Sequence, residues 1–167
     1  MIQTPRLLLR ELTVEDAPFI VQLVNDPAWL QFIGDKGVRT LEDAEKYILN
    51  GPVKSYADNG FGLWLVELKE NNTPIGMCGL INRPTLEGID IGFAYLPQYV
   101  GQGYAFEAAT ATLQYAKQVL LLERVLAITN PENIRSIALL KKLGLQTEKE
   151  YTLPGETRPV LLMSRPL

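Results

Sequence analysis

Two glycines separated by one residue, Gly101 and Gly103, lie between a predicted strand and a predicted helix in the stretch QYVGQGYA. The first turn of a helix has backbone N–H groups without partners, and the helix dipole adds partial positive charge there. Because glycine has no side chain, an anionic group can approach these N–H groups closely. The segment therefore predicts a phosphate site, although a strand-to-helix turn that needs a positive φ explains the same glycines.

The chain contains no histidine and a single cysteine, Cys78. These counts exclude Ser/His/Asp triads, Cys/His pairs, histidine metal sites and an intramolecular disulfide. Cys78 lies in an apolar predicted strand, where a thiol is usually an inert part of the core. We therefore expect no metal ion and no covalent intermediate on this cysteine.

The composition is that of an ordinary globular protein: of 167 residues, 47% are hydrophobic and 21% are charged. The formal net charge of −3 argues against nonspecific nucleic-acid binding. No apolar run approaches the roughly 18 residues of a membrane span, and the start lacks a signal-peptide pattern. We expect one cytoplasmic domain of residues 1–167, with no nucleic-acid or membrane partner.

Hydrophobic periodicity and turn residues predict a mixture of strands and helices. Strands are predicted at residues 6–12, 61–68, 74–82, 88–96 and 124–128, and two more within 146–167. Capping boxes at Thr13 and Thr40 each predict a helix start, and these helices are expected to end near residues 25 and 50. Further helices are predicted at residues 103–120 and 133–143. These elements indicate an α/β (α+β) fold.

Side chains of the predicted strand 88–96 alternate between two faces. The face that we expect to be core carries Ile89, Ile91, Phe93 and Tyr95, and the other face carries Asp90, Gly92, Ala94 and Leu96. After Asp90 the second face is small, which allows an extended ligand to lie against the strand. Steric fit under a helix explains the small residues equally well.

The stretch Gln98–Gly103 resembles the Q/R-x-x-G-x-G/A motif of GNAT-superfamily N-acetyltransferases. Its continuation YAFEA is similar to the branch that includes RimJ and RimL. The family's order also holds for TPRL and LR near the start, DIGF on the strand, and N-x-x-S and KLGL near the end, so the resemblance spans nearly the whole chain. It implies a GNAT-like single domain with a mixed, mostly antiparallel sheet of about seven strands, flanked by helices and splayed near the acetyl-coenzyme A loop.

The resemblance implies acetyl-coenzyme A as the acetyl donor, with its pyrophosphate on the Gly101–Gly103 loop. The backbone of residues 93–96 is expected to hydrogen-bond the pantetheine arm and to polarise the acetyl carbonyl. The implied cofactor contacts are Phe93, Tyr95, Leu96, Gln98, Val100, Gly101, Gln102, Gly103, Tyr104, Ala105, Asn133 and Ser136.

In many family members a tyrosine protonates the departing thiolate, but the aligned position here is Leu140, which has no exchangeable proton. Ser136, one helical turn after Asn133, is the implied donor instead, and a solvated helical serine is the alternative. Asn133 is expected to contact the cofactor, or to cap its helix unless Asn130 holds that cap.

Asp90 is the candidate general base, because partial burial raises the pKa of a carboxyl group towards neutrality. A structural hydrogen bond explains Asp90 at least as well, and a water chain can take the amine's proton without a dedicated residue. Glu107 is expected to support the helix N-terminus electrostatically.

The implied reaction is direct attack of an amine on the thioester, which needs oxyanion support and a proton for the thiolate. The acceptor is a protein N-terminal α-amine, as in ribosomal proteins, or a small amine such as a polyamine, an amino sugar or an antibiotic. The negative net charge favours a basic acceptor. A non-catalytic coenzyme A sensor is the alternative to an enzyme, and the sequence allows a homodimer.

Overall fold

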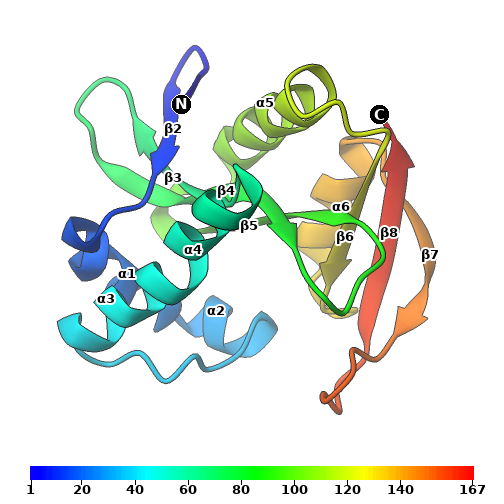
Figure 1. The fold of residues 1–167 in the computed structure, drawn as a ribbon, viewed down its shortest axis with the longest axis horizontal. Coiled ribbons are helices and arrows are strands. Elements are labelled where there is room, and N and C mark those ends of the chain that lie inside the picture. The colour runs from blue at the N-terminus through cyan, green and yellow to red at the C-terminus, as the bar shows by residue number, and fades with distance from the viewer.

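The computed structural model describes residues 1–167 and contains an eight-stranded sheet in the order β1-β2-β3-β4-β5-β6-β8-β7 (Figure 1). The strands are β1 (Ile2–Gln3), β2 (Leu7–Glu11), β3 (Leu63–Leu68), β4 (Pro74–Asn82), β5 (Ile89–Tyr95), β6 (Arg124–Thr129), β7 (Gln146–Tyr151) and β8 (Val160–Pro166). Neighbouring strands are antiparallel except for the parallel pair β5 and β6. The expected mixed, mostly antiparallel sheet is confirmed, with the short β1 as an additional strand.

Six α-helices flank this sheet. They are α1 (Ala17–Val24), α2 (Pro27–Phe32), α3 (Leu41–Ile48), α4 (Lys54–Asn59), α5 (Tyr104–Gln118) and α6 (Ile134–Lys142). Both predicted capping boxes are present, at Thr13 and at Thr40. The short helix α2, which begins at Pro27 behind the capping carboxylate of Asp26, was not predicted.

Helix α3 ends at Ile48, near the predicted residue 50, but the sequence did not predict the helical segment that follows it. After α3 the chain continues through a π-helical turn, Leu49–Val53, into α4, and it leaves the helix only at Gly60, where φ is 79°. Pro52 lies inside the π-helical turn. Proline has no N–H for the bond to residue i−4, and a local π-bulge is one way in which a helix continues past such a gap.

The helices bury two apolar clusters, one on each face of the sheet. Helices α5 and α6 cover a cluster that includes Cys78, Ile91 and Leu113. Helices α1 to α3 cover the other, which includes Met77 and Leu96. The predicted alternation of β5 is therefore confirmed, since Ile91 and Leu96 belong to opposite clusters. None of the helices has the length and hydrophobicity that a membrane-spanning segment requires.

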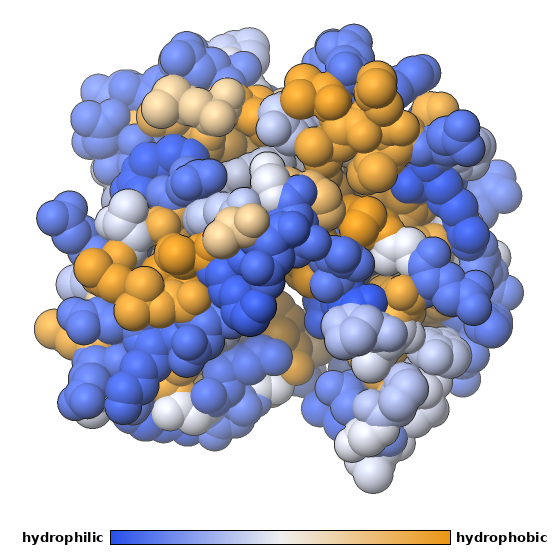
Figure 2. Space-filling view, in the orientation of Figure 1, coloured by the Kyte–Doolittle hydropathy of each residue, from blue (hydrophilic) through white to orange (hydrophobic).

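Strands β5 and β6 are joined at one position only, where Asp90 pairs with Leu126. Beyond this pair the two strands diverge (Figure 1). The space-filling view has a hollow at its lower centre, between the part of the molecule that contains α1 to α4 and the part that contains β6 to β8 (Figure 2). Residues 92–95 of β5 therefore have a free edge on the side of β6, which we call the free edge of β5.

Candidate active site

The glycine loop leads directly into α5. Gly101 and Gly103 have φ values of 82° and 84°, so the turn itself requires both glycines. The backbone N–H groups of residues 101–106 find no acceptor within the protein, and the first N–H of this region that does is that of Glu107, bonded to the Gly103 carbonyl at 3.0 Å. A Cβ atom at Gly101 would meet no other atom within 4 Å. Six consecutive free donors at a helix N-terminus, beside open space, fit an anionic group such as a pyrophosphate.

Arg6 ties the N-terminal segment to this loop. Its Nε atom lies 2.8 Å from Oε1 of Glu107, and its Nη1 donates to the carbonyl oxygen of Gln102 at 3.0 Å. The guanidinium also lies over the ring of Tyr104, 4.3 Å from its centroid. Sequence reasoning did not assign a role to Arg6, although the match of TPRL to the family pattern pointed to this segment.

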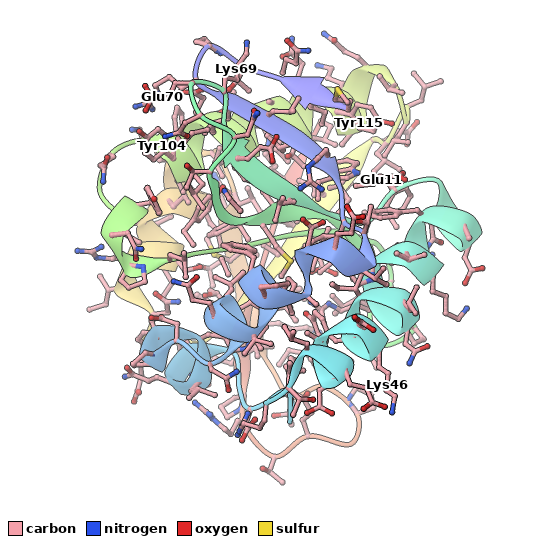
Figure 3. All side chains as sticks on the ribbon, turned by 90° about the vertical axis from the view of Figure 1, so that its left-hand side faces the viewer. Glu11, Lys46, Lys69, Glu70, Tyr104 and Tyr115 are labelled. Carbon is pink, nitrogen blue, oxygen red and sulfur yellow. The ribbon has the colours of Figure 1, made fainter.

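Glu107 is the acidic residue of the first turn of α5, as expected, and it also binds the start of the chain. One oxygen accepts the Arg6 backbone N–H at 3.0 Å and the hydroxyl of Thr4. Burial by itself raises the pKa of a carboxyl group, but the hydrogen bonds from Thr4 and Arg6 outweigh it and lower the pKa of Glu107. Glu107 therefore joins the first turn of α5 to the start of the chain. Figure 3 shows that Tyr104, also in this turn, lies on the same side of the molecule as Lys69 and Glu70 of the β3–β4 turn.

The backbone of β5 presents two residues to its free edge. The N–H of Leu96 donates to the Ile75 carbonyl of β4 at 3.0 Å. Because backbone groups alternate in direction along a strand, those of Phe93 and Tyr95 point away from β4, towards the side of β6. The Leu96 carbonyl already accepts the N–H of Tyr99 at 3.0 Å, and its side chain is 4% exposed. Leu96 thus has no free backbone donor, and its assignment as a cofactor contact remains a prediction.

The other expected loop contacts lie around the glycines. Gln98 and Val100 are exposed, and Ala105 is half-buried in the first turn of α5. The side-chain amide of Gln102 donates to the Gln98 carbonyl at 2.7 Å and closes the loop on itself. The cofactor contacts assigned to these residues remain predictions.

Asn133 caps α6, as the alternative interpretation had it. Its Oδ1 accepts the N–H of Ser136 at 3.2 Å, whereas the Oδ1 of Asn130 accepts the N–H of Glu132 at 2.8 Å. Ser136 is half-buried, and its Oγ accepts the hydroxyl of Thr129, the last residue of β6, at 2.9 Å. The hydroxyl hydrogen of Ser136 therefore remains available for donation, and so does the amide nitrogen of Asn133.

Asp90 lies where β5 and β6 meet. Its side chain is 1% exposed, and Nε of Arg83 lies 3.0 and 3.3 Å from its two carboxylate oxygens. Burial raises the pKa of Asp90 to about 6, and Arg83 opposes this rise. The structural role expected for Asp90 is confirmed by its ion pair with Arg83, and its raised pKa is compatible with the role of general base, which remains a prediction. Sequence reasoning missed Arg83, which is seven residues away along the chain.

Asp90 of β5 and Ser136 of α6 lie beside different positions along β6. Asp90 pairs with Leu126, while Ser136 contacts Thr129, three residues further along, which corresponds to roughly 10 Å of strand. The fold thus places a carboxylate where the two strands meet and a hydroxyl where they have separated.

Cys78 is fully buried, and burial raises the pKa of its thiol to about 12. Its nearest polar contact is the hydroxyl of Thr112 at 3.4 Å. A thiol that stays protonated inside the core is a poor nucleophile. The expected position of Cys78 in the core is therefore confirmed, and its raised pKa fits the inert role predicted for it.

Comparisons with known proteins agree with this geometry. The model of the acetyltransferase (GNAT) domain matches residues 6–146. The uncharacterised N-acetyltransferase YnaD of Bacillus subtilis is 32% identical over 147 residues, which cover 88% of this chain and 83% of that protein. The ribosomal protein uS5-alanine N-acetyltransferase of Escherichia coli is 33% identical over 98 residues, 56% of this chain and 49% of that protein.

A solved structure of a GNAT-family protein is also similar to this chain. The GNAT-family acetyltransferase from Bacillus anthracis superposes with a TM-score of 0.81 at 25% identity, over 99% of this chain and 97% of that one. Together with the match of the family model to residues 6–146, this likeness extends over the whole sheet and its helices. This chain therefore belongs to the GNAT family of acetyl-coenzyme A-dependent N-acetyltransferases.

Proposed function

We propose that this enzyme transfers the acetyl group of acetyl-coenzyme A directly to the α-amine of a protein N-terminus. The choice of acetyl-coenzyme A as acetyl donor, the donor half of the proposal, rests on the six free N–H groups at residues 101–106, next to the free edge of β5. The acceptor half is supported by the E. coli relative, which is named as an N-acetyltransferase of a ribosomal-protein alanine.

Bound acetyl-coenzyme A supplies an activated acetyl group as a thioester. The free N–H groups of the glycine loop bind its pyrophosphate, and the backbone of Phe93 and Tyr95 hydrogen-bonds its pantetheine arm. The same free edge supports negative charge on the acetyl oxygen as the amine attacks. Attack forms the new C–N bond, and collapse breaks the C–S bond.

Two protons move in this reaction, and the chain has one group for each. Asp90 accepts the proton that the amine loses, either directly or through water, and Ser136 donates a proton to the departing sulfur. Because Cys78 is buried and protonated, no acetyl group passes through a cysteine, and the amine attacks the thioester itself.

Acetyl-coenzyme A is expected to stabilise the fold strongly. At about 100 times its Kd, a ligand that binds only the native state adds roughly 2.7 kcal/mol. For a chain of this length that corresponds to a rise of about 5–11 °C in Tm. Differential scanning fluorimetry measures this rise, with acetyl-pantetheine, which lacks the pyrophosphate, as the weaker comparison. No response to millimolar acetyl-coenzyme A would contradict the donor half of the proposal.

Acetylation of synthetic peptides tests the acceptor half. We expect release of free thiol from acetyl-coenzyme A, and mass spectrometry should place the acetyl group on the peptide α-amine. Turnover with polyamines or amino sugars but with no peptide would instead identify a small-amine acetyltransferase. Binding of acetyl-coenzyme A without turnover on any amine would identify a sensor.

Replacing Arg6 by glutamine is expected to weaken acetyl-coenzyme A affinity by roughly tenfold, because hydrogen bonds of a charged group that hold the loop are lost. At saturating donor, kcat should stay close to that of the wild type. The KM for acetyl-pantetheine should not change, since that donor has no pyrophosphate to place on the loop.

The matched control is Arg124→Gln, which removes another exposed arginine–glutamate pair, between Arg124 and Glu148. This variant should bind acetyl-coenzyme A like the wild type. If both variants lose affinity equally, or if Arg6→Gln weakens both donors alike, Arg6 contributes only to general stability.

A further inference from the structure

The first turn of α5 has a lysine beside it that comes from another helix. Lys142, the last residue of α6, places its Nζ atom 4.2 Å from the centroid of the Phe106 ring. Phe106 is the third residue of α5 and lies three residues after Gly103. The ammonium group therefore lies beside the turn that the glycine loop opens.

The Phe106 ring holds this ammonium group in place. A lysine ammonium is attracted to the face of an aromatic ring, which carries partial negative charge. Phe106 is half-buried and packs against the apolar cluster under α5 and α6, so its ring has a fixed position. Lys142 is exposed, so a ligand bound to the glycine loop can reach its ammonium group.

The charged side chains beside this turn add up to a positive charge. Arg6 pairs with Glu107 at 2.8 Å, so these two charges cancel. The ion pairs of the protein do not include Lys142. The residues from Gln98 to Phe106 have no charged side chain. Lys142 is thus a cation at this turn that no carboxylate neutralises.

Acetyl-coenzyme A carries two kinds of phosphate group, and the glycine loop accounts for one of them. The six free N–H groups of residues 101–106 fit the pyrophosphate, a diester. The 3′-phosphate is attached to the same ribose as the pyrophosphate, and as a monoester it carries a charge of about −1.5 to −2 at pH 7. Hydrogen bonds to such a group are strongest from a charged donor. Lys142 is such a donor beside the loop.

We propose that Lys142 binds the 3′-phosphate of acetyl-coenzyme A and makes the enzyme selective for coenzyme A over dephospho-coenzyme A. This inference rests on the donor half of the proposed function and adds a recognition residue to it. Phe106 is a positioning residue, because it acts on the phosphate only through the ammonium group that it holds. Arg6 differs from both, since it contacts the loop itself and its loss should weaken both ligands alike.

Calorimetric titration of coenzyme A and of dephospho-coenzyme A into the protein tests the proposal. We expect the wild type to bind coenzyme A roughly tenfold more tightly, because one charge-assisted contact is lost with the 3′-phosphate. The preference should shrink in high salt, because screening weakens interactions between exposed charges. Equal affinity of the wild type for the two ligands overturns the proposal.

Substitutions of Lys142 locate the effect. Lys142→Gln should lower the affinity for coenzyme A by roughly tenfold and leave that for dephospho-coenzyme A within about twofold of the wild type. Lys142→Arg keeps the charge and should keep the preference. The matched control is Lys117→Gln, which removes an exposed lysine from the other end of α5 and should bind both ligands like the wild type. An undiminished preference in Lys142→Gln overturns the proposal, and so does an equal loss for both ligands, which would place the ammonium group on the pyrophosphate.

Phe106→Leu tests the positioning role, because it keeps an apolar side chain and removes the ring. We expect this variant to lose part of the preference for coenzyme A while its affinity for dephospho-coenzyme A stays the same. A general disturbance of the loop would weaken both ligands equally. That result would overturn the positioning role of Phe106.

Failure of the proposed function gives a different result. If neither ligand binds to the wild type, the donor half of the proposed function is wrong and this inference is wrong with it. If both ligands bind with equal affinity, the donor half stands and this inference alone is overturned. The titrations contain no acceptor, so the acceptor half does not affect either outcome.

Discussion

Replacing Ser136 by alanine is expected to lower kcat by about 100- to 10,000-fold, the usual worth of general-acid help, and to leave acetyl-coenzyme A affinity nearly unchanged. The Ser136 oxygen accepts the Thr129 hydroxyl at 2.9 Å, so its own hydrogen is free to reach the departing sulfur. A serine hydroxyl is a weak acid, and we expect it to relay a proton or to hydrogen-bond the sulfur rather than to titrate. Steady-state kinetics with a verified acceptor and calorimetry with acetyl-coenzyme A measure the two quantities.

Thr129→Val is the companion variant, because it removes the hydroxyl that orients Ser136 and keeps a side chain of similar shape. We expect a smaller fall in kcat, since the Ser136 hydroxyl is still present but less well held. If kcat of Ser136→Ala stays within a few-fold of the wild type, Ser136 is only a contact residue and water supplies the proton.

Replacing Asp90 by asparagine is expected to lower kcat/KM by roughly 100-fold or more, since the proposed base for the amine's proton is lost. In the wild type, kcat/KM should fall as the pH drops below about 6, because protonation of Asp90 removes the base. The variant should lack this acidic limb. A limb near pH 6 that persists in Asp90→Asn would assign it to another group.

The same substitution should also stabilise the protein at pH 8. The pKa of Asp90 is raised from 3.8 to about 6 in the folded state, so the folded state binds the proton more tightly than the unfolded state. The stability that this group contributes is therefore present in its protonated form and is lost as the pH rises from about 4 to 6. At pH 8 we expect Asp90→Asn to be more stable by roughly 1–3 kcal/mol, and less so at pH 4.

Asp16 provides the matched control, since it also pairs with an arginine. It receives two bonds from Arg10, at 2.8 and 3.0 Å, and the Thr13 backbone N–H at 2.9 Å. Burial raises the pKa of Asp16, but these hydrogen bonds outweigh it and lower the pKa. Asp16→Asn should therefore destabilise the protein at pH 8, where Asp90→Asn stabilises it. Denaturant unfolding at both pH values measures the contrast, and a destabilised Asp90→Asn variant at pH 8 would show that the Arg83 pair outweighs burial.

The elements that position the site could be predicted from the sequence because their causes are local. The capping boxes at Thr13 and Thr40 join residues three apart, and the alternation of β5 follows from the two-residue period of a strand. The glycine loop is equally local, since its two left-handed residues and its free N–H groups depend only on the start of α5. These features and the family motif together determined the fold class and the acetyl donor.

Tertiary structure decided the partners of the site residues, because those partners are brought together by packing and not by spacing along the chain. Arg6 meets Glu107 across 101 residues, and Ser136 of α6 meets Thr129 at the end of β6. The pKa of Asp90 depends on its burial between β5 and β6, which no sequence pattern specifies. Burial and long-range contacts set charge states, so the Arg83 partner of Asp90, the raised pKa of Asp90 and the contact of Arg6 with the glycine loop emerged only from the folded chain.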